Sequence, residues 1–295
     1  MKNILITGAN SYIGTCFEKY AYEHYSDKLA VDTVDMIDGS WRGKDFSAYE
    51  AVFHVAGIAH ADVGNVTDEI KAKYYAVNTE LAIETAKKAK EDGVKQFVFM
   101  SSAIIYGDSA PYGESKLITN DTEPSPANFY GDSKWQADKG VRELSDESFN
   151  VTVLRPPMIY GKGSKGNYPV LSKMASKLPV FPNVKNERSM LYIENLCEFL
   201  CQVMINNKGG IYWPQNAEYS RTSEIVKMIA EAKNHKILVS GIFNPAVKLA
   251  SIIPGKTRNL ANKAFGNLTY DMAMSECDFD YRVADLKTSI ERTER

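Results

Sequence analysis

The sequence lacks the features that define several large classes of protein. Its 295 residues include only four cysteines, without the spacing of a disulfide framework, so we expect free thiols. Its formal net charge is -2, which favours neither nucleic acid nor a membrane surface as a partner. No stretch approaches the roughly 20 apolar residues that span a bilayer, and the first apolar run is too short for a signal peptide. We therefore expect a cytoplasmic protein without stable membrane insertion.

Metal-ligating residues are scattered along the chain. Cys197 and Cys201 are four apart, as on one helix face, but no other ligand shares their spacing. Two small apolar residues on a buried helix face explain this pair better, and no metal site is predicted. The other candidates that we considered are Cys16, Cys277, His24, His54, His60 and His235.

The first half of the chain alternates short apolar strands with helical stretches. Candidate strands are NILIT, LAVDTVDM, YEAVFHVAG, KQFVFMSS and FNVTVLRPP. Helical patterns begin near Tyr12, run through YYAVNTELAIETAKKAKEDG to Gly93, and include NFYGDSKWQADKG. Apolar strands that alternate with helices predict a parallel sheet covered on both faces, which is a Rossmann-type, doubly wound α/β fold.

The pattern changes after residue 165, where a Gly/Lys loop and proline-punctuated segments follow. We predict a dinucleotide-binding domain over residues 1–165, with a return strand near 210–214. Residues 166–295 are predicted to form a smaller, interleaved and mostly helical lobe that binds substrate.

A glycine loop follows the first predicted strand in ILITGANSYIGTCFEKY. A helix N-terminus placed there directs its free N–H groups at a pyrophosphate. The middle glycine of the GxxGxxG spacing is replaced by Ser11, and a tight turn without a ligand is the alternative. The predicted cofactor contacts in this loop are Gly8, Asn10, Ser11, Tyr12, Ile13 and Gly14.

An acidic residue about 20 positions further on should bind the adenosine ribose and repel a 2′-phosphate. Asp35 lies 21 residues after Gly14, and Asp32 is its rival if the strand ends earlier. This carboxylate favours NAD. Arg42 and Lys44 could hold a 2′-phosphate instead, so NADP stays open.

Tyr130 and Lys134 are four residues apart, which places them one turn apart on one helix face. The phenol needs its pKa lowered by about 3, or about 4 kcal/mol, to exchange protons near neutral pH. The Lys134 ammonium would act in that direction. Ser101 and Ser102 end a strand at the ligand-binding edge of the sheet, where a hydroxyl can polarise a substrate oxygen. Together these residues predict hydride transfer at a carbinol or carbonyl carbon.

The chain resembles the extended short-chain dehydrogenase/reductase family of sugar-nucleotide epimerases, dehydratases and reductases over nearly its whole length. The matching stretches are TGANSYIG, HVAGIAH, AVNTELA, SSAIIYG, YGDSK and LRPPMIYG. The resemblance implies a catalytic set of Ser102, Tyr130 and Lys134. It implies further cofactor contacts from Ala56, Gly57, Asn78, Pro157, Tyr130 and Lys134.

The same resemblance narrows the reaction. UDP-galactose 4-epimerases of this family usually carry asparagine three residues after the arginine that matches Arg155, where this chain has Met158. The stretch is similar instead to the 4-keto reductases of capsule and O-antigen pathways, which act on UDP-2-acetamido-2,6-dideoxy-4-hexulose. Two readings stay open beside this one: a UDP-hexose 4-epimerase with bound NAD, and a non-catalytic dinucleotide-binding regulator.

The resemblance also implies contacts for a UDP-sugar between the lobes. Around the hexose it places Ser101, Ser102, Ala103, Tyr130 and Pro156, and around the diphosphate and uridine it places Asn167, Tyr168 and Arg188. Family members often dimerise through a four-helix bundle, so we expect a homodimer paired through the helix after Asn78 and the helix that bears Tyr130.

Residues 244–268 mix apolar side chains with Lys248, Lys256, Arg258 and Lys263. Such a mixture is typical of a membrane-surface segment, although Pro254 and Gly255 exclude one long helix. We favour the alternative, a part of the C-terminal lobe whose lysines extend along it to the solvent.

Overall fold

The computed structural model describes residues 1–59 and 66–295, and His60 at the end of HVAGIAH lies outside them. Six parallel strands form the central sheet, in the order β10-β6-β4-β3-β1-β2. This confirms the predicted Rossmann-type fold. The strands are β1 (Lys2–Thr7), β2 (Leu29–Val34), β3 (Ala51–His54), β4 (Gln96–Met100), β6 (Asn150–Leu154) and β10 (Gly210–Tyr212).

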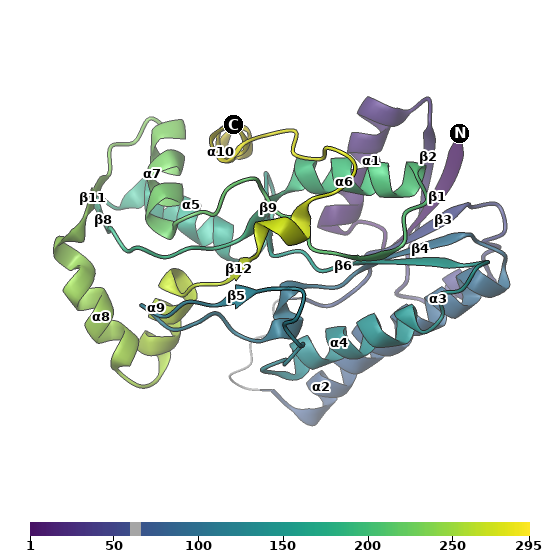
Figure 1. Ribbon diagram of the computed structural model, residues 1–295, viewed down its shortest axis with the longest axis horizontal. Helices are drawn as coiled ribbons and strands as arrows, with labels where there is room; N and C mark the ends of the chain where they lie inside the picture. The colour runs from purple at the N-terminus through teal and green to yellow at the C-terminus, as the bar shows by residue number, and fades with distance from the viewer. Residues whose placement is uncertain (60–65) are drawn as a thin grey trace.

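Helices cover both faces of this sheet (Figure 1). Ile4 and Ile6 of β1 face a core shared with α1 (Tyr12–Tyr25) and α6 (Ile193–Ile205). Leu5 between them faces the core formed with α3 (Leu81–Glu91) and α4 (Phe129–Arg142). All three side chains are fully buried, so this alternation follows the two-residue period of a strand that is covered on both sides.

The order of the strands creates a switch point beside β1. This strand pairs with β2 on one side and with β3 on the other, so the chain winds outward from it in both directions. Ligands of open α/β sheets bind at the carboxyl edge of such a point. The glycine loop, Ala56 and Gly57 all follow the carboxyl ends of these strands.

The C-terminal part of the chain forms a smaller lobe, while α6 and β10 return to the sheet domain (Figure 1). Its helices are α5 (Asn167–Lys177), α7 (Thr222–Ala232), α8 (Asn244–Ile252), α9 (Lys256–Phe265) and α10 (Leu286–Glu294). Short strands pair as β7 (Met158–Tyr160) with β9 (Met190–Tyr192), β8 (Val180–Pro182) with β11 (Leu238–Ser240), and β5 (Leu117–Ile118) with β12 (Thr269–Tyr270).

The remaining elements are short turns of helix and one helix near the active site. They are α2 (Asp68–Tyr75), the π-helical turn η2 (Ala76–Glu80), and the 3₁₀ turns η1 (Ser40–Gly43), η3 (Ala103–Tyr106), η4 (Gly241–Phe243) and η5 (Met272–Ser275). Within residues 1–59 and 66–295, no helix is long and apolar enough to cross a bilayer.

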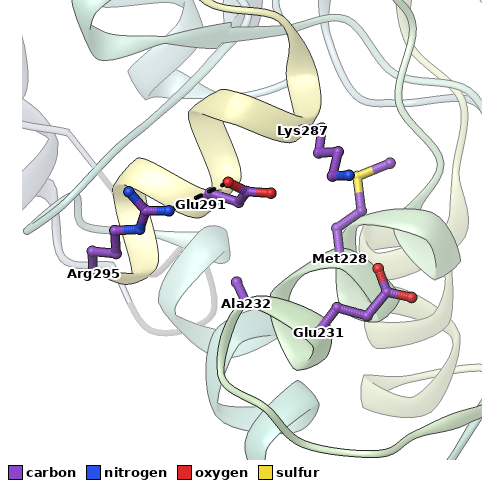
Figure 2. A pocket seen from close by; sticks show the side chains of 6 residues that line it. All are labelled: Met228, Glu231, Ala232, Lys287, Glu291 and Arg295. Carbon is purple, nitrogen blue, oxygen red and sulfur yellow. Dashed lines mark ion pairs between the residues drawn. The ribbon is translucent and has the colours of Figure 1, made fainter.

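A surface hollow lies where α7 faces α10 (Figure 2). The chain end crosses the lobe there, and Glu291 pairs with Arg295 along α10 at 3.6 Å. The side chains that line the hollow are Met228, Glu231, Ala232, Lys287, Glu291 and Arg295. None of them is a predicted site residue.

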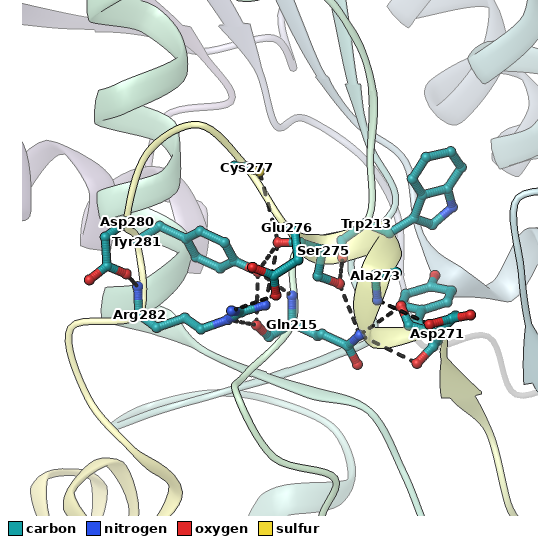
Figure 3. Close-up of polar contacts among 11 residues, drawn as sticks. Trp213, Gln215, Asp271, Ala273, Ser275, Glu276, Cys277, Asp280, Tyr281 and Arg282 are labelled. Atoms are coloured by element: carbon teal, nitrogen blue, oxygen red, sulfur yellow. Dashed lines mark hydrogen bonds and ion pairs between the residues drawn. The ribbon is translucent and has the colours of Figure 1, made fainter.

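A network of polar contacts fixes the segment before α10 to the loop after β10 (Figure 3). The Gln215 side chain donates to Ser275 Oγ at 2.9 Å. The Tyr281 hydroxyl accepts from Gln215 N at 3.1 Å and donates to Gln215 O at 2.9 Å. Arg282 donates to Ser275 O at 3.3 Å. These bonds join the last part of the chain to the edge strand of the sheet domain.

Candidate active site

The glycine loop has the geometry of a close-approach turn. Gly8 has φ +117°, and a Cβ there would lie 2.8 Å from Ala56 N, so only glycine fits. Asn10 also has a positive φ, of 63°. Ser11 caps α1 by accepting from Gly14 N at 3.2 Å, so the serine that replaces the middle glycine begins the helix. The loop thus leaves backbone room and a helix N-terminus for the pyrophosphate of a dinucleotide.

Tyr12 and Ile13 form the first turn of α1, and both pack against the apolar core on this face. The Tyr12 hydroxyl lies 2.8 Å from the position of a Cβ on Gly161, so the side chain reaches the loop after β7. Burial raises the pKa of this phenol. Tyr12 therefore positions the glycine loop against the start of the C-terminal lobe.

The acidic residue after β2 lies beside the glycine loop. Asp35 directly follows the strand and is exposed, and Gly8 N donates to Val34 O at 3.0 Å. Asp32 lies within the strand, and its carboxylate accepts from the Tyr49 hydroxyl at 2.8 Å. Of the two carboxylates considered for the ribose, Asp35 is therefore the one at the strand end.

The cations considered for a 2′-phosphate already have partners. Arg42 donates to Glu84 through Nε at 2.5 Å and through Nη2 at 2.6 Å, and its guanidinium stacks on Trp41. The Lys44 ammonium lies 5.4 Å from the centre of the Tyr49 ring.

A π-helical turn carries Asn78 toward the cofactor edge, where the sequence predicted a continuous helix. Its Oδ1 accepts from Ile58 N at 2.8 Å, and its Nδ2 donates to Ser133 Oγ at 3.1 Å. A Cβ on Gly57 would lie 3.1 Å from Asn78 Oδ1 and 3.2 Å from Lys134 Nζ. Asn78 thus joins the loop after β3 to α4, and π turns often occur at functional sites.

Lys134 is buried on α4, which begins after the N-cap Asn128. Its ammonium donates to Met100 O at 3.0 Å and lies 5.1 Å from the centre of the Phe99 ring. Burial lowers the pKa of Lys134 to about 8, because desolvation disfavours the charged form.

Tyr130 lies one turn before Lys134 and packs edge-on against Tyr74, with ring centres 5.9 Å apart. Burial raises the pKa of Tyr130 to about 12; Tyr74 adds to this, and the Ser102 hydroxyl acts in the opposite direction. The sequence argument asked for a lowered pKa from Lys134. In the protein alone Lys134 is not among the groups that shift this pKa, and desolvation favours the neutral form of the phenol.

The strand-end serines and the loop after β6 lie side by side. Ala103 N donates to Pro156 O at 2.9 Å, and Ser102 Oγ accepts from Ile104 N at 3.3 Å. Ser101 and Pro157 are buried, and in the described chain the Ser101 hydroxyl has no hydrogen-bond partner. These contacts place Ser102, Ala103 and Pro156 together at the carboxyl edge of the sheet.

Sequence reasoning missed a buried ion pair that holds this edge in place. Asp138 accepts from Arg155 Nε and Nη2, both at 2.9 Å, and Arg155 Nη1 donates to the Tyr106 hydroxyl at 2.8 Å. Asp138 is fully buried on α4, and Arg142 also donates to it at 2.9 Å. Its place four residues after Lys134 puts Asp138 on the same helix face, but this spacing does not show which residue it pairs with.

The structure places the predicted diphosphate and uridine contacts in the C-terminal lobe. Tyr168 is buried and stacks on Tyr160 with ring centres 5.2 Å apart, while Asn167 begins α5. Arg188 donates to Lys263 O at 2.7 Å and to Gly266 O at 2.9 Å. Burial lowers the pKa of Arg188 to about 10. Between the described residues, no hydrogen bond joins these three side chains to Ser102, Tyr130 or Lys134.

A close-approach glycine turn at a helix N-terminus, a strand-end carboxylate and a Tyr–Lys pair beside a serine define a dinucleotide-dependent oxidoreductase. The NAD dependent epimerase/dehydratase family model matches residues 4–213, and the chain belongs to this family. It is therefore an NAD-dependent enzyme of the epimerase/dehydratase kind, which confirms the predicted family and cofactor class.

Relatives of known name share most of the chain. It is 31% identical over 255 residues to a UDP-glucose 4-epimerase of Vibrio cholerae, covering 78% of this chain and 76% of the relative. It is 25% identical over 254 residues to the N-acetyl-alpha-D-glucosaminyl-diphospho-ditrans,octacis-undecaprenol 4-epimerase of Escherichia coli O157:H7, covering 80% and 73%. The dTDP-4-dehydrorhamnose reductase of Bacillus anthracis in complex with NADP shares the fold, with a TM-score of 0.73, 18% identity and coverage of 99% and 98%.

Proposed function

We propose that this enzyme reduces the C4 ketone of a UDP-4-keto-6-deoxy-N-acetylhexosamine for surface polysaccharide synthesis. The observation that supports this choice is Met158, at the position where UDP-galactose 4-epimerases of the family usually carry asparagine. A reductase also needs a proton donor at O4, and burial raises the pKa of Tyr130 to about 12, which favours the acid form of the phenol.

In this proposal each catalytic side chain acts on one atom of the substrate or cofactor. Tyr130 donates its proton to the sugar O4 as charge develops there. The Ser102 hydroxyl donates a hydrogen bond to the same oxygen and stabilises that charge. Lys134 binds the nicotinamide ribose and Asp35 the adenosine ribose, and bound NADH or NADPH supplies the hydride.

The substrate contacts extend from this centre into the C-terminal lobe. Ser101, Ala103 and Pro156 would contact the hexose. Asn167, Tyr168 and Arg188 would face the diphosphate and uridine; within the described chain, Arg188 Nη1 makes no hydrogen bond and is the donor available to a phosphate. A cytoplasmic homodimer paired through α3 and α4 stays a prediction that sedimentation velocity tests.

A 4-epimerase is the second candidate, and the two relatives named above as 4-epimerases favour it. Such an enzyme uses Tyr130 twice, first to take the O4 proton and then to return it after the 4-keto sugar has rotated. The same residues serve both reactions, so the test has to follow the fate of the coenzyme.

The test offers the purified enzyme UDP-2-acetamido-2,6-dideoxy-4-hexulose with NADH or NADPH and records the loss of reduced coenzyme. Stoichiometric oxidation that disappears in Tyr130→Phe supports the 4-reductase. Interconversion of UDP-GlcNAc and UDP-GalNAc, or of UDP-glucose and UDP-galactose, without net coenzyme oxidation would establish the epimerase. Coenzyme binding without turnover of any of these sugars would point to the non-catalytic regulator.

A further inference from the structure

An unpartnered apolar stripe runs along the outer side of η4 and α8. Ile242 is 77% exposed, Leu249 56% and Ile252 63%, and Leu260 of α9 is also 63% exposed. Soluble proteins scatter such side chains singly, whereas a run of large aliphatic residues on one segment marks an interaction site. We call this surface, with its neighbouring basic residues, the α8–α9 face.

The phase of α8 explains the stripe. Val247 and Ser251 turn inward, where Val247 packs against the main core and Ser251 is buried. Leu249, Ile252 and Ile253 fall on the opposite side and are all exposed. The helix thus turns a valine and a serine inward and its larger aliphatic side chains outward. A surface helix that only covers a core has the reverse arrangement.

The inner side of α9 is anchored to the C-terminal lobe. Ala261 and Phe265 of α9 are buried, and Arg188 donates to Lys263 O at 2.7 Å. The Asn262 side chain accepts from Tyr112 N at 3.1 Å. The prediction that residues 244–268 pack on the C-terminal lobe therefore describes the inner side of this segment. No part of the described chain covers its outer side.

Charge around the stripe is of one sign. Residues 232–270 contain six lysines and arginines and neither aspartate nor glutamate, although the whole chain carries a formal net charge of -2. Only Lys233 of the six has an ion-pair partner in the described structure, Glu294 at 2.9 Å. The other five are Lys236, Lys248, Lys256, Arg258 and Lys263.

We propose that the α8–α9 face docks on an anionic membrane surface. Its aliphatic side chains would enter the boundary between headgroups and acyl chains, while the unpaired cations would meet lipid phosphates. An anionic bilayer offers both an apolar boundary for the aliphatic stripe and lipid phosphates for the uncompensated positive charge around it. Docking is peripheral, since α8 is nine residues long and cannot span.

The position of the face determines which lobe of the protein would contact the membrane. Figure 1 shows α8 and α9 at the end of the molecule away from the sheet domain. α9 is also the helix that Arg188 holds. The membrane would thus contact the substrate-binding lobe and leave the cofactor domain in solution. This inference does not rest on the reaction being a reduction or an epimerisation.

Co-sedimentation with vesicles tests the proposal. The full-length protein is mixed with phosphatidylcholine vesicles that contain or lack phosphatidylglycerol, at low and high salt. Leu249→Ser/Ile252→Ser removes part of the stripe, and Lys256→Gln/Arg258→Gln removes two charges. Tyr22→Ser is the matched control, because Tyr22 is 77% exposed on α1, outside this face.

We expect binding that requires phosphatidylglycerol and weakens with salt. The charge variant should bind roughly tenfold or more weakly, since each cation near the surface contributes about fivefold. The stripe variant should lose about tenfold or more, and Tyr22→Ser should bind as the unaltered protein does. Unchanged circular dichroism and an unchanged urea-unfolding midpoint identify the variants as folded.

Three results would overturn the proposal. The first is negligible sedimentation with phosphatidylglycerol vesicles at low salt, and the second is equal sedimentation of the stripe variant and the control. The third is a fall in the sedimentation coefficient of the stripe variant without any change in vesicle binding, which would assign the face to a second copy of the chain. None of these results bears on catalysis in solution, so failure here is distinct from failure of the proposed reaction.

Discussion

At the residue scale, desolvation moves the two members of the Tyr–Lys pair toward their neutral forms. The pKa of Tyr130 rises to about 12 and that of Lys134 falls to about 8. In the proposed reduction a neutral phenol is the proton donor. The ammonium would have to stay charged to orient the ribose, so we expect the charge state of Lys134 to limit the working pH.

The first prediction concerns Tyr130→Phe. We expect the rate of ketone reduction to fall by about 10² to 10⁴, the usual contribution of a positioned proton donor. In the unaltered enzyme, the reductive rate should be flat below pH 8 and decline as Lys134 loses its proton above about 8. Stopped-flow coenzyme absorbance measures both. A decline that instead begins near pH 6 would contradict the assignment of this group.

Lys134→Met tests the cost of the buried ammonium. The pKa of Lys134 is lower in the folded protein than in the unfolded chain, so below pH 8 its charge destabilises the fold. Without added coenzyme, the substitution should raise the unfolding free energy by about 2 kcal/mol, after about 1 kcal/mol is lost with the hydrogen bond to Met100. Urea unfolding at pH 7 measures this. Lys139→Met, on the exposed side of α4, is the control and should change the unfolding free energy little. A Lys134→Met protein that is less stable than the unaltered protein would contradict the predicted cost of the buried charge.

At the element scale, α4 is the part that carries and fixes the site. Tyr130, Lys134 and Asp138 lie on successive turns of one face, and Asp138 joins the helix to the loop after β6 through Arg155. Any shift of α4 therefore moves the phenol relative to Ser102. The ion pair acts as a positioning contact between two elements.

Breaking this ion pair should have unequal effects from its two sides. Asp138→Ala leaves the buried Arg155 guanidinium without an anion and should cost about 3–5 kcal/mol of stability. Arg155→Met should cost less, because Arg142 still donates to the Asp138 carboxylate. Thermal unfolding of both variants and of the double variant measures this order. Equal losses would show that Arg142 does not compensate.

We expect the segment after β2 to set the preference for coenzyme. Asp35 lies at the strand end, and Glu84 holds the Arg42 guanidinium with two hydrogen bonds. Asp35→Ser should raise kcat/KM with NADPH relative to NADH by about tenfold, through loss of repulsion with the 2′-phosphate. Adding Glu84→Gln, which frees Arg42, should increase the shift. Asp32→Ser is the control, and a matching shift there would reassign the ribose contact.

At the scale of the whole molecule, one buried histidine couples the sheet to pH. His54 is fully buried, bonds to Thr7 Oγ1 at 2.8 Å, and stacks on Phe97 and Phe99. Burial lowers the pKa of His54 from 6.5 to about 3, and the Lys134 charge adds to this. Between pH 6.5 and about 3, His54 therefore binds a proton in the unfolded chain but not in the folded protein.

This linkage makes the fold sensitive to acid. As pH falls from 6.5 toward 3, His54 should reduce the unfolding free energy by up to about 1.4 kcal/mol per pH unit. Urea unfolding across that range should show a shallower slope in His54→Gln than in the unaltered protein. The same slope in both proteins would remove His54 as its cause.

The amino-acid sequence by itself determined the local parts of this protein. Strand and helix periodicity predicted the doubly wound sheet, because apolar spacing is set by each element's own geometry. The turn at Gly8 and the spacing of Tyr130 and Lys134 are likewise short-range features, and they could be read from a few adjacent residues.

Tertiary structure decided what depends on residues far apart in the chain. The sequence did not indicate that Asp138 pairs with Arg155. It also did not indicate that the Arg188 guanidinium donates to backbone carbonyls at the end of α9. Both contacts join elements that are distant in the chain. The raised pKa of Tyr130 arises from burial by its neighbours, and no spacing encodes burial. The outward phase of α8 was hidden too, because an apolar stripe has the same sequence period whether it faces a core or the solvent.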